Sequence, residues 1–171
     1  YVAIFTPALD GATTIDVAGG AFTDGASNAN TAATQFNWTF DSIAPTLAIT
    51  AAEVSDGATS NDATLALTFT ASEATSNFVV GDITVSNGAL SSFVAASPTV
   101  YVAIFTPAAD GATTIDVAGG AFTDGASNAN TAAAQFNWTF DSTAPTLSSV
   151  SIASNNATTT TANIDDVVTL T

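Results

Sequence analysis

One segment of this chain occurs twice at a spacing of 100 residues, and this repeat constrains the fold more than any other feature. Residues 1–47 and 101–147 differ at three positions only, where Leu9, Thr34 and Ile43 are replaced by Ala109, Ala134 and Thr143. A fixed period within one chain is typical of a tandem array of structural units. We therefore look for the function in what arrays do, which is to span a distance, repeat a surface or polymerise.

The charge composition excludes several classes of partner. The 171 residues include 15 Asp and Glu but no Lys, Arg or His, so the formal net charge is -15. Such a chain repels nucleic acid and anionic lipid headgroups, and it has no apolar run long enough for direct membrane insertion. We do not expect an enzyme, because His, Cys and Lys are all missing. The richness in Thr, Ala, Ser, Asn and Gly favours a secreted, extracellular bacterial setting.

Alternation of apolar and polar residues predicts β-strands along the whole chain. Phe136, Trp138 and Phe140 occupy one face of a segment whose other face is polar, which is typical of a half-buried strand and makes this stripe a core rather than a sugar-binding platform. No helical stripe exceeds about one or two turns. Between residues 45 and 144 the pattern predicts seven strands, at 46–52, 63–71, 82–86, 89–95, 99–106, 113–118 and 134–141.

Seven short strands in one repeat predict an all-β fold made of tandem immunoglobulin-like (Ig-like) antiparallel β-sandwich domains of about 100 residues. Another antiparallel sandwich or an open barrel is the alternative. The segments FDSIAPT and FDSTAPT, at 40–46 and 140–146, contain a proline that favours an extended linker. We therefore predict the last three strands of one repeat at 1–44, a complete repeat at 45–144, and the first two strands of the next repeat at 145–171.

Acidic side chains are expected to meet at one pole of the complete sandwich. Two loops at this pole carry Glu73 with Asp82, and Asp124 with Asn128, while Asp41 lies in the linker above them. Carboxylates that have no basic partner repel one another unless a cation lies between them, and oxygen ligands alone favour Ca2+. Further candidates are Asp10, on a turn that faces the junction, and the equivalents one repeat away, Asp24, Asp110 and Asp141. The alternative is that Asp and Asn merely form turns here.

Five sequence segments, taken in order, resemble those of a known protein family. The segments DSTAPT, LTFTASEATSNF, GDITVSNGALSSF, VYVAIFTPAADG and FTDGASNANTA are similar to the bacterial Ig-like tandem repeats of giant surface adhesins of the biofilm-associated and RTX types. This resemblance implies a secreted, cell-anchored stalk whose domains are joined end to end and stiffened by Ca2+ at the junctions. Related repeats usually carry Gly before the Asn of FTDGASN, where this chain has Ser27 and Ser127.

Two functions follow as hypotheses. The first is an extender region that holds an adhesive tip away from the cell. The second is a self-assembling extracellular filament or sheath, a homopolymer in which neighbouring molecules complete the terminal half-domains. In both, the partners are neighbouring Ig-like repeats of the same or adjacent chains. A ligand-binding module is disfavoured because the loops at 8–13 and 20–31 are almost copied between units.

Overall fold

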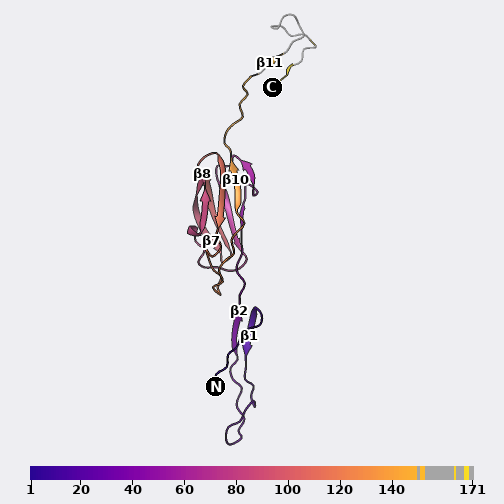
Figure 1. Ribbon diagram of the computed structural model, residues 1–171, viewed down its shortest axis with the longest axis vertical. Coiled ribbons are helices and arrows are strands. Elements are labelled where there is room, and N and C mark those ends of the chain that lie inside the picture. The colour runs from indigo at the N-terminus through magenta and orange to yellow at the C-terminus, as the bar shows by residue number, and fades with distance from the viewer. Residues whose placement is uncertain (150, 153–163, 165–167, 170–171) are drawn as a thin grey trace. The chain divides into compact units, whose positions relative to one another are not determined.

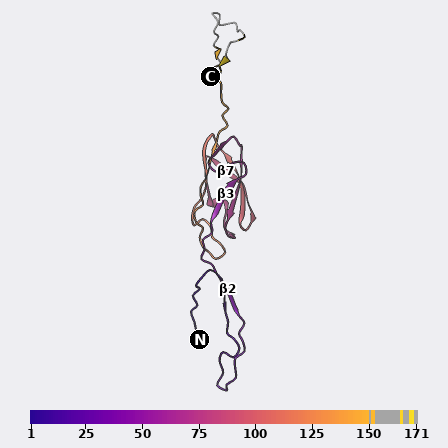
Figure 2. The same ribbon diagram turned by 90° about the vertical axis from the view of Figure 1, so that its right-hand side faces the viewer.

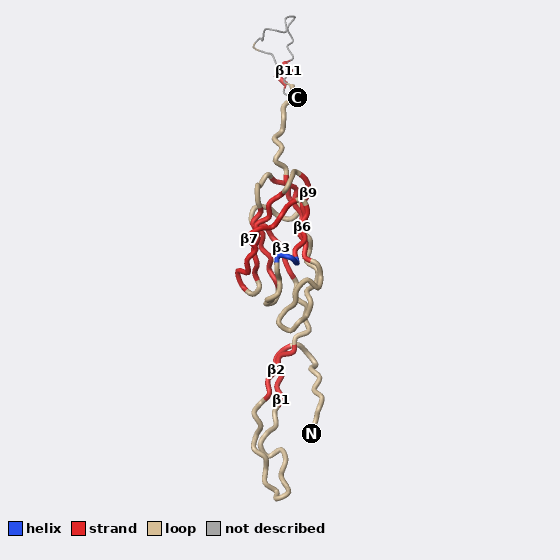
Figure 3. Tube along the Cα trace, turned by 90° about the vertical axis from the view of Figure 1, so that its left-hand side faces the viewer, coloured by secondary structure: helices blue, strands red, loops and turns tan. Residues whose placement is uncertain are grey.

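The computed structural model describes residues 1–149, 151–152, 164 and 168–169, and it consists of β-strands and connecting loops. It divides into two compact units, Tyr1–Asp141 and Ser142–Thr171. One short 3-10 turn, η1 (Val80–Asp82), is the helical element of the described part (Figure 3). Within the described residues, no helix is long and apolar enough to cross a membrane.

The complete repeat forms a sandwich of two four-stranded sheets, which confirms the predicted fold (Figures 1 and 2). One sheet contains, in spatial order, β3 (Leu47–Ala51), β5 (Leu65–Ala71), β8 (Val100–Pro107) and β7 (Gly88–Ser97). The other sheet contains β4 (Ala58–Ser60), β10 (Phe136–Phe140), β9 (Gly111–Val117) and β6 (Ile83–Ser86). Each of the seven predicted strands is present, with boundaries that shift by a few residues.

The strand β4 is the element that the sequence pattern does not predict. It pairs parallel to β10, with Ala58 opposite Trp138, whereas the other paired strands are antiparallel. The chain reaches it by crossing from one sheet to the other through a turn at Asp56 and Gly57. Asp56 accepts a hydrogen bond from the backbone N–H of Asn137 at 2.7 Å, and Gly57 has a φ of +79°. Three residues are too few for an alternation signal.

The core lies between the two sheets and is rich in aromatic rings. Trp138 is 1% exposed, meets Phe105 edge to face and donates its indole N–H to the Ser60 hydroxyl at 3.0 Å. Phe136 is 3% exposed. The stripe is therefore core, as predicted. Among the described residues, no buried side-chain nitrogen or oxygen lacks a hydrogen-bond partner.

The segment before the linker forms two strands, where three were predicted. β1 (Gly11–Ile15) pairs with β2 (Phe36–Phe40) in the same register as β9 with β10. Residues 1–6 form no strand. Their equivalent in the complete repeat, β8, pairs with β5 and β7 on its two sides, and residues 1–44 contain no counterpart of either strand. A strand without neighbours has no backbone hydrogen bonds to sustain it.

The second unit contains two short strands, β11 (Ser151–Ile152) and β12 (Val168–Thr169), which pair antiparallel. The predicted first two strands of a further repeat fall in this segment. Most of residues 150–171 lie outside the described residues, so the assignment of 145–171 to the next repeat stays a prediction.

Candidate metal centre

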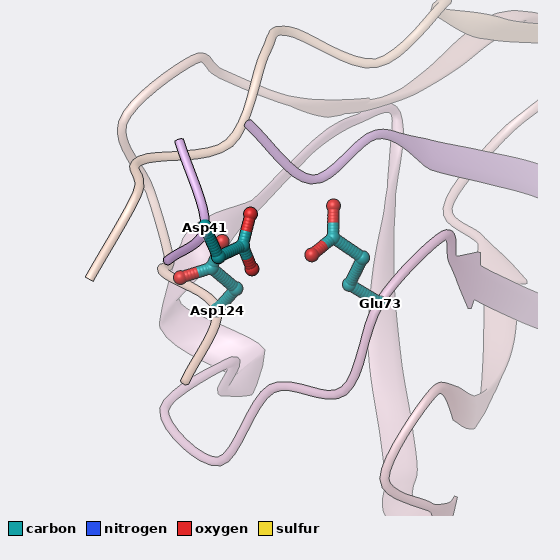
Figure 4. A group of neighbouring side chains, drawn as sticks. All are labelled: Asp41, Glu73 and Asp124. Carbon is teal, nitrogen blue, oxygen red and sulfur yellow. The ribbon is translucent and has the colours of Figure 1, made fainter. Parts of the chain in front are cut away.

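Three carboxylates from distant parts of the sequence meet at one end of the sandwich. Asp41 follows β2, Glu73 lies in the loop after β5, and Asp124 lies in the loop between β9 and β10. We call these three residues the triad, and one carboxylate oxygen of each lies within 4.8 Å of the others. Figure 4 shows the Glu73 carboxylate pointing toward the other two. The predicted convergence of the linker and the two loops is therefore present.

Hydrogen bonds between the two loops set the position of Glu73 relative to Asp124. The Asn77 side chain donates to the Thr123 hydroxyl at 3.2 Å and accepts from the Thr123 backbone N–H at 3.0 Å. Thr75 forms an isolated β-bridge with Asp124, and its carbonyl accepts from the Tyr101 hydroxyl at 2.8 Å. Sequence reasoning missed Asn77, because nothing in its surroundings distinguishes it from the other loop asparagines.

The loop around Asp124 is folded by its own side chains. One Asp124 oxygen accepts from the backbone N–H groups of Ala126 and Asn128, and the other accepts from the Asn128 amide at 2.9 Å. Burial raises the pKa of Asp124, but these hydrogen bonds outweigh burial and hold the pKa below its usual value. At the base of the loop, the buried Asn130 accepts from the Phe122 N–H and donates to the Ala118 carbonyl.

Glu73 experiences the opposite effect. Burial, followed by the negative charges of Asp41 and Asp124, raises the pKa of its carboxyl above the ordinary value of 4.5. No basic side chain exists in the chain to relieve this repulsion. A bound cation would relieve it.

This pKa shift predicts a pH dependence of stability in the presence of a chelator. The folded state binds a proton at Glu73 more tightly than the unfolded state, so folding gains stability as the pH falls through the raised pKa toward 4.5. We expect the melting temperature to rise as the pH is lowered from 7 toward 4.5, and Glu73→Gln to reduce that rise. Asp116→Asn removes a carboxylate from β9, outside the triad, and should leave it unchanged. Equal pH profiles for the parent and Glu73→Gln would contradict this account of the site.

Ser127 occupies the position at which the resemblance to surface-adhesin repeats implies glycine, and its backbone conformation is one that favours glycine. Ser127 has a φ of +74° and Ser27 a φ of +66°, both in the left-handed region that glycine adopts without steric cost. The loop therefore keeps its geometry in both copies despite the substitution. Its hydrogen bonds, including that from the Ser127 N–H to the Asp124 carbonyl at 3.3 Å, hold the residue there.

Ser127→Gly is expected to stabilise the complete repeat by up to about 1 kcal/mol, since relief of left-handed strain exceeds the added entropy of glycine in the unfolded chain. Equilibrium denaturant unfolding would measure the change. Ala126→Gly, at a neighbouring loop position without a positive φ, should not stabilise. A destabilised Ser127→Gly variant would show that the serine hydroxyl matters more than its backbone.

The remaining predicted site residues lie outside the triad. Asp82 accepts from the Val79 N–H at 2.8 Å at the start of η1. Asp10 accepts from the Ser42 N–H at 2.5 Å. Asn128 directs its amide N–H2 at Asp124 and at the Asp41 carbonyl, so in this arrangement it is a donor. Three further candidates correspond to Asp124, Asp10 and Asp41 at a spacing of 100 residues. These residues also lie outside the triad, and they are Asp24, Asp110 and Asp141.

The donor set fits a hard divalent cation. Three carboxylates supply up to six oxygens, and Ca2+ takes six to eight oxygen ligands in flexible geometry. A cleft of 690 Å³ that is lined by Phe40, Asp41, Glu73 and Asp124 among others gives access from solvent. Asp41, Glu73 and Asp124 are thus the residues that could hold the ion.

Comparison with known proteins assigns the family. A family model described as the bacterial Ig-like domain matches residues 41–140, which is more than half of the chain. The chain belongs to this family. No curated protein and no solved structure matches it. The matched segment begins at the linker residue Asp41, and its length equals the spacing of the internal repeat.

Proposed function

We propose that this chain is part of the extender region of a secreted bacterial cell-surface adhesin, with a structural rather than a catalytic role. Its Ig-like repeats are joined end to end, and Ca2+ at each linker restricts their relative motion. The observation that carries the proposal is the triad, in which the linker supplies Asp41 and the loops of the following repeat supply Glu73 and Asp124. Binding one cation to all three attaches the linker to the loops.

The linker itself is short and already anchored. β2 ends at Phe40 and β3 begins at Leu47. The buried Pro45 accepts from the Thr131 N–H at 3.0 Å, and Thr46 donates to the Ser72 hydroxyl at 2.9 Å. Few linker residues are left to move once Asp41 is held.

The segment before the linker supports the tandem arrangement. Its sequence is nearly that of 101–141, yet Trp38 is 43% exposed where Trp138 is 1% exposed, and Phe36 is 61% exposed where Phe136 is 3% exposed. An apolar face that is core in one copy needs the same partner strands in the other. We therefore propose that residues 1–44 are the end of a preceding repeat, whose first strands resemble those at 45–99.

The near identity of the copied loops also suits an extender. Between loops 8–13 and 108–113 the single change is Leu9 to Ala109, and loops 20–31 and 120–131 are identical. A spacer unit needs no individual ligand. Variable loops would instead be expected in a binding module.

The test uses a protein with a copy of residues 45–100 placed before Tyr1, which creates two complete repeats in natural order. Small-angle X-ray scattering is expected to give a larger maximum dimension in Ca2+ than in chelator, since the cation removes repulsion at the linker. Asp41→Ala should abolish the difference, whereas Asp116→Ala, which removes the same charge from β9, should not. An unchanged maximum dimension in the two buffers would show that Ca2+ does not stiffen the linkers and that the array is a passive tether.

A filament subunit is the second candidate, and the exposed apolar face of residues 1–41 favours it. In that case residues 1–171 should associate through this face, and the added copy of 45–100 should prevent association by covering it. Sedimentation velocity of the two proteins separates the functions. A monomeric chain 1–171 at high concentration would count against the filament.

A further inference from the structure

Two copies of one loop allow the effect of the linker to be isolated. In the first copy, the Asn28 backbone N–H and amide donate to the two oxygens of Asp24, each at 2.9 Å. Asn128 makes the same two bonds to Asp124, also at 2.9 Å. The loop therefore folds in the same way whether or not a linker lies against it.

Asn128 makes one additional bond, which Asn28 lacks. Its amide also donates to the backbone carbonyl of Asp41 at 3.2 Å. Both partners of the Asn128 amide are pure acceptors, a carbonyl and a carboxylate, so the orientation of its N–H2 group is unambiguous. Asn128 is half-buried and Asp124 is 7% exposed, whereas Asn28 and Asp24 are exposed. Two features distinguish the environments: the linker, and the loop after β5 whose Thr75 and Asn77 contact the second copy.

The other side of the same peptide group is bound from the preceding hairpin. The carbonyl of Asp41 and the N–H of Ser42 belong to one planar peptide unit. Its oxygen accepts from Asn128, and its N–H donates to the Asp10 carboxylate on the turn before β1. One rigid group is thus hydrogen-bonded by side chains on both sides of the junction.

We propose that the Asp41–Ser42 peptide is a latch that holds the junction without any cation, with Asn128 and Asp10 as its positioning residues. The latch also fixes the backbone that carries the Asp41 carboxylate. Its role in aligning repeats rests on the proposed function, but its existence does not, because it acts in the absence of metal. Asn128 then supports cation binding as a donor and not as a ligand.

The test measures the junction in the whole chain with chelator present. The chain contains no Cys, so spin labels can be attached at Thr14→Cys in β1 and Thr84→Cys in β6, both exposed positions. Pulsed electron resonance gives the distribution of distances between the labels. Asn128→Ala and Asp10→Ala each remove one hydrogen bond of the Asp41–Ser42 peptide. This loss is expected to lower the ratio of latched to unlatched junctions roughly 2- to 10-fold and to broaden the distribution.

Matched controls exist in the neighbouring copies. Asn28→Ala removes the equivalent side-chain bond to Asp24 without touching the linker, and Asp110→Ala removes the carboxylate equivalent to Asp10 one repeat on. Both should keep the narrow distribution. Asn128→Asp preserves the side-chain shape but removes the donor, and amide exchange at Ala126 reports whether the loop stays folded. Narrow distributions in Asn128→Ala and Asn128→Asp, with the loop folded, would overturn the latch.

A second measurement with Ca2+ separates this inference from the proposed function. If the distance distributions of the Asn128 variants broaden in chelator and become narrow again in Ca2+, the latch and the cation both act on the junction. If these distributions broaden in chelator and Ca2+ does not change their width, the latch is supported and the proposed stiffening by Ca2+ is wrong. If only Ca2+ affects the width, the latch fails alone.

Discussion

Trp138→Ala is expected to lower the free energy of unfolding of the complete repeat by about 3 to 5 kcal/mol, the usual cost of deleting a large buried aromatic side chain. Trp138 fills the centre of the core beside Phe105 and Phe140. The substitution leaves a cavity and also removes the indole donor of the Ser60 hydroxyl, which keeps only its bond to Asp62. Equilibrium unfolding in denaturant, followed by far-UV circular dichroism, measures the change.

Trp38→Ala is the matched control, because the pentapeptide FNWTF surrounds both residues. Trp38 lies on the exposed face of β2, so its replacement in the chain 1–171 should cost much less. Placing a copy of residues 45–100 before Tyr1 should make the two substitutions equally costly. If Trp38→Ala destabilises the original chain as much as Trp138→Ala does, the proposal that residues 1–44 are an incomplete repeat is wrong.

Addition of Ca2+ is the second large expected effect. A ligand that binds only the folded state at a hundredfold excess over its dissociation constant stabilises by about 2.7 kcal/mol. For a repeat of this size, that corresponds to a rise in melting temperature of roughly 10 to 20 °C. Differential scanning calorimetry in Ca2+ and in chelator measures it.

Asp41→Ala should abolish most of this rise while leaving the loops of the complete repeat folded, because Asp41 lies in the linker. Asp124→Ala should abolish it as well, but it also removes the acceptor of three hydrogen bonds, from the backbone N–H of Ala126 and from the backbone and side chain of Asn128. Asp116→Ala should retain the full rise. If Asp41→Ala and Asp116→Ala respond to Ca2+ alike, the triad does not hold the ion.

Much of the fold could be predicted because strand formation in a sandwich leaves a local signature. The alternation in Phe136, Trp138 and Phe140 identifies a strand and its buried face, and the 100-residue spacing identifies the unit. β4 could not be predicted. Its three residues are held by pairing with β10 and by the bond from Asn137 to Asp56, 81 residues apart in sequence. No local pattern records such a contact.

Sequence reasoning likewise placed some residues of the candidate site correctly and others wrongly. Once the strands are known, the order of strands in an Ig-like sandwich predicts which loops share one end. It places Glu73 and Asp124 at the same end, with Asp41 in the linker above them. The same reasoning included Asp82, whose carboxylate caps η1 instead. It also treated Asn128 as an oxygen ligand, and the structure directs its N–H2 group at two acceptors. Which atom of a side chain faces a site depends on its partners, and these come from other segments.

The two copies of this segment show what the sequence alone determined and what only the tertiary structure decided. The hairpin register, the left-handed serine and the hydrogen bonds within the FTDGASN loop are the same in both copies, because each arises between residues close in the chain. The burial of Trp138 and Asp124 has no equivalent in the first copy. Burial requires β3 to β7 to cover one face and the linker to cover the loop. The same residues thus form an exposed face in one copy and a core with a candidate metal centre in the other.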